Sequence, residues 1–531
     1  MVDGRRTIAR AAGVISAATF LSRILGFIRD MVVAKAFGAG MATDSFFVAF
    51  RLPNMLRELL GEGALSAAFV PVFAERLRRG GNEAWELARK TLTVLGLLLI
   101  AVSLLGVLLA PALVRILAPG FSTVPEKLTL TIRLTRWIFP YIFCVGIGAL
   151  FMGILNALGH FATPALSPVM LNLAMIASVL FLASRLDEPI FALAYGVLLG
   201  GILQLCIQVP IAARKGLPFR PTLDFEDPSL LRIGRLMIPG TLGLAITQIN
   251  VFIGTFLASF LDQGSISYLY YAFRLIQFPI GLFGVALATA LLPTLSSQAS
   301  VRSLEAVKGT LMFSMRFAFF LTLPAMLGLI VFRVPIIFLL FERGEFTRAE
   351  TLATAEILLF YSLGLMFYVL NRVVAPVYYA FQDTKTPVLI GAGAVLSNIV
   401  FSLLLMPTLG ARGLALATSL SSLVNFFWLV RRLKSKLGPL GWGGQVTPFV
   451  KTSLAALTIL LLSLLVPAEI LLVEGFQGTL RVGGVLAATA ILFLLAAWLM
   501  RCEELNFLKE ALVGRGPQPN GGKANMSDIF G

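Results

Sequence analysis

The chain has 531 residues, of which 58% are hydrophobic and only 13% are charged, and its mean hydropathy is +0.90. A soluble domain of this length carries about 25% charged residues, so the composition excludes a soluble protein. The net charge of +16 does not predict a nucleic-acid partner, because the lysines and arginines lie at the ends of apolar runs and not in one basic domain.

The sequence shows no pattern that is typical of a metal site, a disulfide framework or a nucleotide-binding site. The cysteines are far apart, and the single histidine, His160, cannot build a histidine metal site. No Walker motif is present, and the loops are too short for an ATPase domain. We therefore expect no metal and no cofactor. Energy for transport would come from a partner, the membrane potential, an ion gradient or the gradient of the substrate itself.

A membrane-crossing helix needs about 20 apolar residues, and the sequence predicts about fourteen such spans. The second span is interrupted by Gly61-Glu62-Gly63 and is expected to be kinked or discontinuous. Basic residues are more frequent in the loops on one side, which places both termini in the cytoplasm. The predicted spans are 13–36, 42–74, 88–117, 130–157, 163–184, 190–212, 232–261, 267–296, 310–340, 352–381, 387–407, 412–433, 447–468 and 479–500.

Short identical segments recur at one offset. Ala49-Phe50-Arg51-Leu52 returns as Ala272-Phe273-Arg274-Leu275, and Thr163-Pro164 returns as Thr386-Pro387, in both cases 223 residues later. This spacing predicts an all-α membrane protein with two parallel six-helix repeats and two further C-terminal helices. The expected domains are a lobe at 1–220, a lobe at 221–437, two additional helices at 438–502 and a cytoplasmic tail at 503–531.

Charged residues are densest in the first two predicted spans, between Ser22 and Pro71. A charge at the centre of a bilayer costs at least about 2.5–3.5 kcal/mol, so such residues normally face a cavity or a partner. We therefore expect these spans to line a cavity, together with the repeat-related segment of the second half. The candidate ligands are the arginines Arg23, Arg29, Arg51, Arg57 and Arg274.

Guanidinium groups bind phosphate oxygens in pairs and keep their charge when water is removed. Arginines that converge from both halves would therefore suit a phosphate or pyrophosphate ligand. The alternative is that each arginine pairs with a nearby carboxylate or extends to the membrane surface. Asp44 and Glu62 are expected to orient the arginines, gate the cavity or exchange protons, and the sequence leaves these roles open.

A polar pattern in the second half suggests a cation site made by Asn398, Ser402 and Thr418, with Gln248 and Asn250 as further candidates. Ordinary hydrogen bonding between helices explains the same residues and is the more common arrangement in membranes.

The charged stretch and its repeat also resemble a known family. The runs SRILGFIRD (22–30), TDSFFVAFRLPNMLRELLGEGALSAAFVPVF (43–73) and YYAFRLIQFPIGLFGVALATALLPTLS (270–296) are similar to the MurJ/MviN family of the multidrug/oligosaccharidyl-lipid/polysaccharide exporter superfamily. The resemblance covers essentially the whole chain. It implies a flippase of lipid II, the undecaprenyl-pyrophosphate-linked precursor of peptidoglycan, that works by alternating access in a bacterial inner membrane. The expected partners are lipid II, membrane lipids and the cell-wall synthesis machinery.

The resemblance also implies which residues act. By matching motif, the functional positions of the family fall on Arg23, Arg29, Asp44, Arg57, Glu62 and Arg274. Arg51 stands where the family commonly has a basic residue. A sodium-coordinating acidic residue proposed for some relatives would fall near Ser402, which carries no charge, so the resemblance argues against sodium coupling.

Two other functions remain open. A drug/cation antiporter, or a flippase of another lipid-linked saccharide, belongs to the same superfamily, but a cation exporter would favour acidic cavity residues. A membrane glycosyl or phosphoglycosyl transferase would act on the same lipid. Such an enzyme needs acid–base or metal-binding residues in ordered loops, and these loops offer none. We expect a transporter and not an enzyme.

Overall fold

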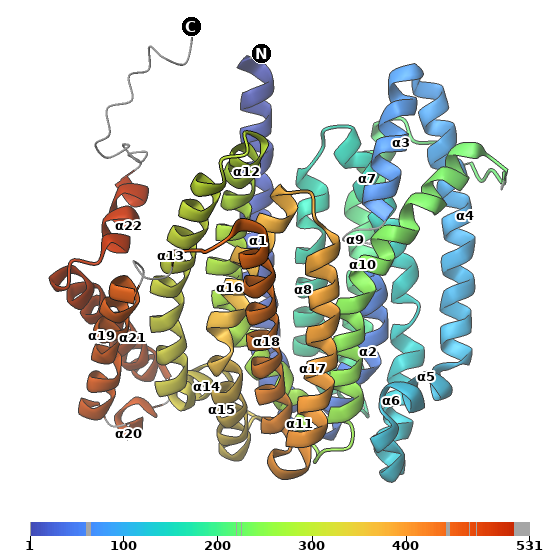
Figure 1. Cartoon of the computed structure of the whole chain (residues 1–531). Helices are drawn as coiled ribbons and strands as arrows, with labels where there is room; N and C mark the ends of the chain where they lie inside the picture. The colour runs from blue at the N-terminus through green and yellow to red at the C-terminus, as the bar shows by residue number, and fades with distance from the viewer. Residues whose placement is uncertain are drawn as a thin grey trace, which may run out of the picture. The chain divides into compact units, whose positions relative to one another are not determined.

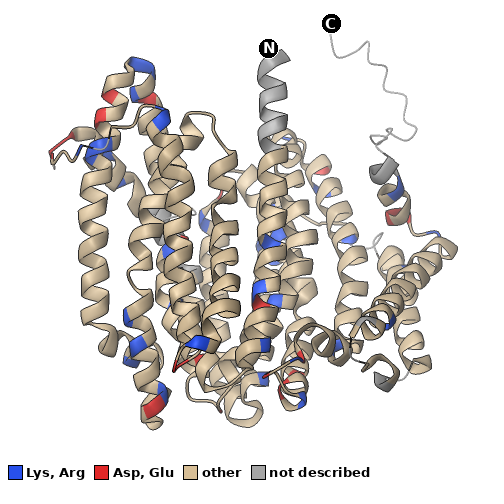
Figure 2. Cartoon of the chain, turned by 180° about the vertical axis from the view of Figure 1, so that it is seen from behind, with Lys and Arg blue, Asp and Glu red and all other residues tan. Residues whose placement is uncertain are grey.

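The computed structural model describes residues 2–59, 65–218, 220–224, 226–441, 446–466, 468–473 and 475–513, and every regular element within them is a helix (Figure 1). In this part of the chain, 11 helical stretches are long and apolar enough to cross a membrane. Figure 2 shows long helical stretches without a charged residue. The chain is therefore an all-helical, multi-pass membrane protein, as the sequence predicts.

The elements follow the predicted spans in order. Each span coincides with one helix or with consecutive helices. The first half contains α1 (Val2–Phe37), α2 (Met41–Leu59), α3 (Leu65–Arg79), α4 (Gly81–Leu108), α5 (Ala110–Leu117), α6 (Pro125–Ile138), α7 (Tyr141–Ala157), α8 (Ala162–Leu182) and α9 (Phe191–Arg214). Short 3₁₀ turns lie at Pro119–Thr123 and Ala183–Arg185.

The second half contains α10 (Pro228–Ala258), α11 (Ser265–Pro279), α12 (Ala286–Ser300), α13 (Leu304–Val331), α14 (Arg333–Phe341), α15 (Arg348–Leu363), α16 (Leu365–Ala380), α17 (Lys385–Leu409) and α18 (Ala411–Leu437). A π-helical turn, Ile280–Val285, joins α11 to α12 directly after Pro279. The C-terminal elements are α19 (Val446–Leu465), α20 (Ala468–Leu471), α21 (Gly475–Leu499) and α22 (Glu503–Val513).

Helix boundaries repeat with the period found in the sequence. Helix α4 runs from Gly81 to Leu108 and α13 from Leu304 to Val331, so both ends differ by 223 residues. The starts of α6 and α15 and the ends of α9 and α18 differ by the same number. One tetrapeptide match and one dipeptide match were therefore enough to identify a repeat that extends through the helices of both halves.

The predicted interruption of the second span falls between α2 and α3. Helix α2 ends at Leu59 and α3 begins at Leu65. Gly61, Glu62 and Gly63 lie outside the described residues, so their predicted break and the predicted role of Glu62 are not addressed by the structure.

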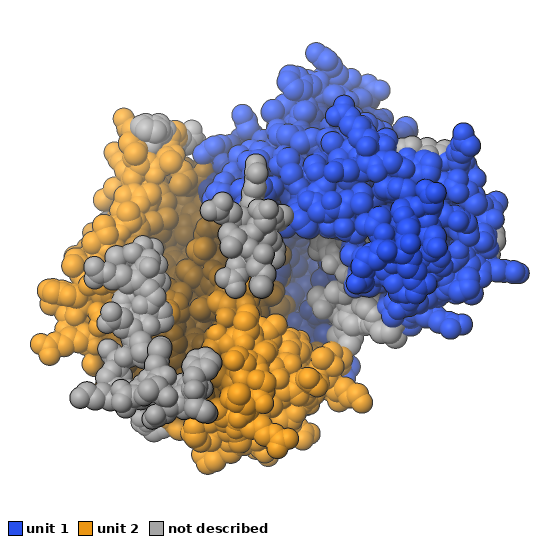
Figure 3. Space-filling model, turned by 90° about the horizontal axis from the view of Figure 1, so that it is seen from above, with its two compact units in different colours: residues 1–273, 340–357, 395–417 blue, residues 274–339, 358–394, 418–531 orange. Residues whose placement is uncertain are grey.

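Contacts divide the chain into two compact units, coloured separately in Figure 3. The first unit comprises residues 1–273, 340–357 and 395–417, and the second comprises 274–339, 358–394 and 418–531. The predicted domains at 1–220, 221–437, 438–502 and 503–531 follow the sequence repeat, and they stay a prediction.

The core of the first unit is centred on α7, which is buried along most of its length. Phe69 and Phe73 of α3 pack there with Phe151 of α7. Gly106 of α4 lies against the ring of Phe139, where a Cβ atom would stand 1.8 Å from a ring carbon. Close helix packing at a small residue is typical of membrane proteins, since it increases van der Waals contact.

In the second unit, the C-terminal helices pack on α13. Phe320 of α13 is buried with Ala455 and Ala456 of α19 and Phe493 of α21. Helix α22 is attached to α13 by the ion pair of Arg316 with Glu504, at 2.8 Å. The two predicted extra helices are therefore integral parts of this unit.

Candidate functional site

Arg29 lies at the centre of a hydrogen-bonded network in the first unit. Its Nη2 and Nε atoms donate to Asp30 Oδ1 at 2.7 and 3.0 Å. Nη1 donates to the amide oxygen of Asn172 at 3.1 Å, and Nη2 donates to the hydroxyl oxygen of Tyr270 at 3.0 Å. Helices α1, α8 and α11 therefore meet at one guanidinium group, whose charge Asp30 compensates.

The partners of Arg29 are themselves held in place. The Asn172 amide donates to the backbone oxygen of Ser22 at 3.0 Å, and the Tyr270 hydroxyl donates to Asp30 at 3.1 Å. The ring of Tyr270 stacks on Phe47 of α2. Asp30 is 2% exposed, so this ion pair is shielded from water. In this conformation Arg29 joins helices, which agrees with the pairing alternative considered from the sequence.

Arg23 lies on the same helix, but its surroundings are different. It precedes Arg29 by six residues, which corresponds to about 9 Å along an α-helix. Its side chain is exposed, and in the described part of the chain it pairs with no carboxylate. A free guanidinium in an apolar helix is costly in a bilayer unless it meets a cavity, water or a ligand. Arg23 is thus available to an anion in a way that Arg29 is not.

A second polar network surrounds Arg57. Arg57 Nε donates to Asn54 Oδ1 at 3.0 Å, and Asn54 Nδ2 donates to Glu58 at 2.9 Å. Glu58 also accepts from the side chain of Gln248 on α10 at 2.6 Å. The network positions the Arg57 side chain, which is 26% exposed. Arg51, six residues earlier on α2, is half-buried.

Arg274 belongs to the second unit. It lies on α11 and is half-buried, and its Nη1 atom donates to Gln277 Oε1 at 3.3 Å. Four of the predicted arginines are therefore in the first unit and one is in the second.

Asp44 is fully buried and holds the start of α2 to other elements. Its carboxylate accepts from Lys127 Nζ at 2.7 Å, from the backbone nitrogens of Gly264 and Ser267 at 2.8 and 2.9 Å, and from the Ser267 hydroxyl at 2.7 Å. The structure brings Asp44 together with a lysine and the first turn of α11, and not with an arginine.

Two residues of the predicted cation site are hydrogen-bonded to each other in the first unit. The hydroxyl of Ser402 donates to Asn398 Oδ1 at 3.3 Å, within α17, and both residues are buried. Thr418 is in the second unit, whereas this pair is in the first. Gln248 bonds to Glu58, as described above. The cation site therefore stays a prediction.

Sequence reasoning missed Lys127, Asn172 and Tyr270, each of which binds a carboxylate or a guanidinium in the structure. Lys127 falls just before the predicted span at 130–157. Asn172 is a lone polar residue within the apolar span at 163–184, which was a usable signal. Arg372 on α16 gives the same signal, because it is a basic residue within an apolar helical stretch that is long enough to cross a membrane.

Comparisons with known proteins identify relatives of the chain. A family model described as lipid II flippase MurJ matches residues 33–502. A Vibrio cholerae protein named probable lipid II flippase MurJ is 42% identical over 428 residues, which are 79% of this chain and 82% of the relative. A Burkholderia cenocepacia protein named lipid II flippase MurJ is 36% identical over 432 residues, covering 80% and 84% of the two chains.

Solved structures give the same result. A lipid II flippase MurJ in an inward closed conformation matches with a TM-score of 0.77 and 28% identity, covering 94% of this chain and 99% of its own. An inward-facing multidrug resistance transporter of the MATE family in the MOP superfamily matches with a TM-score of 0.65 and 16% identity, covering 80% and 98%. The second likeness shows the fold alone.

Proposed function

The chain belongs to the MurJ family of lipid II flippases, and we propose that it moves lipid II from the inner to the outer leaflet of a bacterial inner membrane. The observation that carries this proposal is the family match through residues 33–502. The arginines on α1 and α2 support it, because guanidinium groups suit the pyrophosphate of this substrate.

The arginines contribute to the proposed mechanism in different ways. Arg23, which is exposed, would bind the pyrophosphate, and Arg274 would contribute a further guanidinium group. Arg57 would join them from the network that fixes its side chain. Arg29 would first have to exchange Asp30 for the substrate, or it would hold α1 to its neighbours throughout the cycle. The lipid chain would stay in the bilayer while the headgroup crosses.

The hydrogen bonds of Asp44 support a gating role for this residue. It ties α2 to the first turn of α11 through bonds that link segments 223 residues apart. Breaking these bonds would separate the two helices, and re-forming them would bring the helices back together, as alternating access requires. The carboxylate would thereby stabilise one conformation of the cycle.

Both termini would lie in the cytoplasm, and no covalent bond of the substrate would change. No cofactor would be needed, and energy would come from the membrane potential or an ion gradient. Asn398 and Ser402 would be part of any cation site in the second half, with Thr418 as a further ligand.

The test is replacement of the native lipid II flippase in a bacterium from which that protein can be depleted. Growth is followed, and lipid II is quantified in each leaflet. We expect the chain to restore outer-leaflet lipid II and Arg23→Ala to abolish it. Arg412→Ala is the matched control, because Arg412 forms a surface pair with Glu356 in which both side chains are about half exposed. Failure of the well-inserted chain to restore outer-leaflet lipid II would indicate another lipid-linked saccharide.

A further inference from the structure

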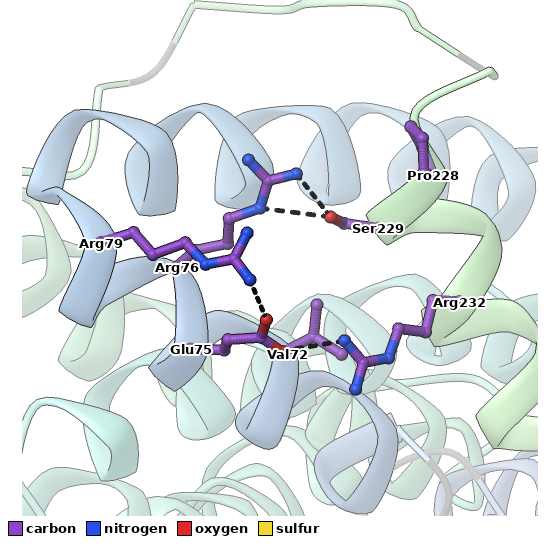
Figure 4. A pocket seen from close by; sticks show the side chains of 7 residues that line it. All are labelled: Val72, Glu75, Arg76, Arg79, Pro228, Ser229 and Arg232. Carbon is purple, nitrogen blue, oxygen red and sulfur yellow. Dashed lines mark hydrogen bonds and ion pairs between the residues drawn. The ribbon is translucent and has the colours of Figure 1, made fainter.

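A basic pocket lies between the end of α3 and the start of α10 (Figure 4). Its volume is about 250 Å³, which is below the usual size of a pocket for a drug-like molecule. The side chains of Arg76, Arg79 and Arg232 face it, and Val72 and Pro228 provide an apolar part of its lining. Three guanidinium groups therefore surround a space suited to a small, anionic headgroup.

The three arginines of the pocket donate to one carboxylate and one hydroxyl of the lining, and Arg76 Nη1 also donates to Glu83, beside the lining, at 2.9 Å. Glu75 accepts from Arg79 at 2.6 Å with one oxygen and from Arg232 at 2.9 Å with the other. Both nitrogens on one edge of Arg76 donate to the Ser229 hydroxyl, at 3.3 and 2.8 Å. Two guanidinium groups thus share one carboxylate, and the third binds a neutral hydroxyl with one edge and Glu83 with its remaining nitrogen.

The lining has a surplus of positive charge. Three arginines line the pocket, and two carboxylates pair with them: Glu75 in the lining and Glu83 beside it. A hydrogen bond from Arg232 and the charge of Arg79 hold the pKa of Glu75 below its ordinary value, so this carboxylate stays ionised at neutral pH. Arg79 and Arg232 are 61% and 58% exposed, so both can turn towards an incoming anion.

The position of the pocket on α3 favours a lipid. The helix is apolar and buried at Leu65, Phe69 and Phe73, and its last turn carries the arginines. A pocket at this transition would meet the headgroup layer of a bilayer. Basic pockets between membrane helices bind anionic headgroups because several guanidinium groups can share the oxygens of one phosphate.

We propose that this pocket binds a phosphate group, supplied by the headgroup of an anionic phospholipid, and that Glu75 occupies the phosphate position when the lipid is absent. The phosphate displaces the carboxylate and takes over its hydrogen bonds from Arg79 and Arg232. Arg76 supplies further donors when it releases Ser229. The site is separate from the arginines of α1 and α2, so it does not depend on the proposed flipping activity.

The test is a titration of the purified full chain, delipidated in a neutral detergent, with short-chain phosphatidylglycerol, with binding counted by native mass spectrometry. We expect Arg79→Gln/Arg232→Gln to weaken binding by about fivefold to thirtyfold, because each basic residue near the headgroup contributes roughly fivefold. The matched control is Arg431→Gln/Arg432→Gln, which removes the same charge at two exposed positions of α18. An equal loss in both double variants would overturn the proposal.

A second variant tests displacement of the carboxylate. Glu75→Gln frees Arg79 and Arg232, so we expect phosphatidylglycerol to bind about two- to fivefold more tightly, the size expected for two exposed ion pairs. Glu305→Gln is the control, since Glu305 is 87% exposed and its removal changes the net charge equally. If both variants raise the affinity to the same extent, the effect is one of overall charge, and the displacement step is wrong.

A further titration separates lipid from soluble phosphate. Inorganic pyrophosphate is added to the protein in neutral detergent, with and without phosphatidylglycerol. We expect millimolar pyrophosphate to leave the bound phosphatidylglycerol in place, since the apolar lining favours the lipid. Binding of pyrophosphate that depends on Arg79 and Arg232 and displaces the lipid would keep the phosphate site and overturn the lipid as its source.

Discussion

Phe47 of α2 and Tyr270 of α11 stack with their ring centroids 4.1 Å apart, although 223 residues separate them in the sequence. The same separation relates Asp44 to Ser267, which are joined by a hydrogen bond of 2.7 Å. Because 223 residues is the period of the repeat, equivalent positions of the two repeats meet here. Within the first unit, this contact joins α2 to the first half of α11.

Tyr270 also links this contact to Arg29, which yields a prediction for a positioning residue. Tyr270→Phe keeps the ring on Phe47 but removes the hydroxyl that contacts Arg29 and Asp30. Hydrogen bonds to charged groups contribute about 1.5–3 kcal/mol, so we expect transport to fall by roughly tenfold to a hundredfold. Outer-leaflet lipid II is the measurement, and Tyr379→Phe, at an exposed position, is the control. Normal transport in Tyr270→Phe would show that the hydroxyl does not matter for Arg29.

The buried pair of Asp44 and Lys127 leads to a prediction about stability. Removal of one partner leaves the other charged and buried, which costs about 3–5 kcal/mol. We therefore expect Asp44→Asn and Lys127→Met each to lower the thermal unfolding midpoint in detergent strongly. The double variant should be less destabilised than the sum of the two, since neither charge remains. Additive losses would indicate that the pair is not coupled.

Gly264 is predicted to be intolerant of a side chain. Its φ of +90° lies in the left-handed region, and a Cβ atom there would stand 2.4 Å from the backbone oxygen of Ala39. We expect Gly264→Ala to destabilise the protein by about 1–3 kcal/mol and to loosen the bonds of Asp44. Gly309→Ala is the control, because Gly309 is inside α13 with open space around it and should gain about 0.5–1 kcal/mol. Equal unfolding midpoints would contradict the prediction.

Asp383, in the turn between α16 and α17, is predicted to make stability depend on acid. The pKa of its carboxyl is lowered from 3.8 to about 2, first by Lys436 and then by the backbone nitrogen and hydroxyl of Thr386. Because the pKa is lowered in the folded state, the stabilisation is complete above about pH 5 and is lost as the pH falls towards 2.

The measurement for Asp383 is the thermal midpoint of Asp383→Asn and of the unaltered chain at pH 6 and pH 2. We expect the variant to be less stable at pH 6 and the difference to shrink at pH 2, where the carboxyl of the unaltered chain is also protonated to a large extent. Asp187→Asn, at an exposed position, should show no such dependence. A difference that does not change with pH would contradict the assignment.

The sequence predicted the spans and the repeat well, because both depend on patterns that extend over many residues. Twenty apolar residues in a row have few alternatives to a membrane helix. Several helix boundaries recur at the same offset of 223 residues, so two short sequence matches were enough to find the repeat. The extra helices were found for the same reason, and their packing on α13 needed the structure.

The partners of individual side chains were much harder to predict. The pairing of Arg29 with Asp30 was a foreseeable alternative, since the residues are neighbours. Its bonds to Asn172 and Tyr270 cross 143 and 241 residues and depend on how three helices are rotated about their axes. Hydropathy does not determine that rotation in helices with few polar residues. Lys127 was missed because the pattern placed it outside a span.

Arg274 is the only one of the five candidate arginines that lies in the second unit. Arg274→Ala should abolish outer-leaflet lipid II while leaving expression and insertion intact, because the guanidinium group is expected to bind the substrate. Arg274→Lys should recover only part of the activity, since an ammonium group cannot bind a phosphate with two parallel hydrogen bonds.

Gln277→Ala is the matched control for this side chain, and we expect it to retain transport. The three variants are compared as the sole copy in the depleted bacterium, with lipid II measured in each leaflet. Full activity of Arg274→Ala would remove the second unit from the proposed pyrophosphate site. Equal activity of Arg274→Lys and the unaltered chain would show that a single positive charge, and not the guanidinium fork, is what the substrate requires.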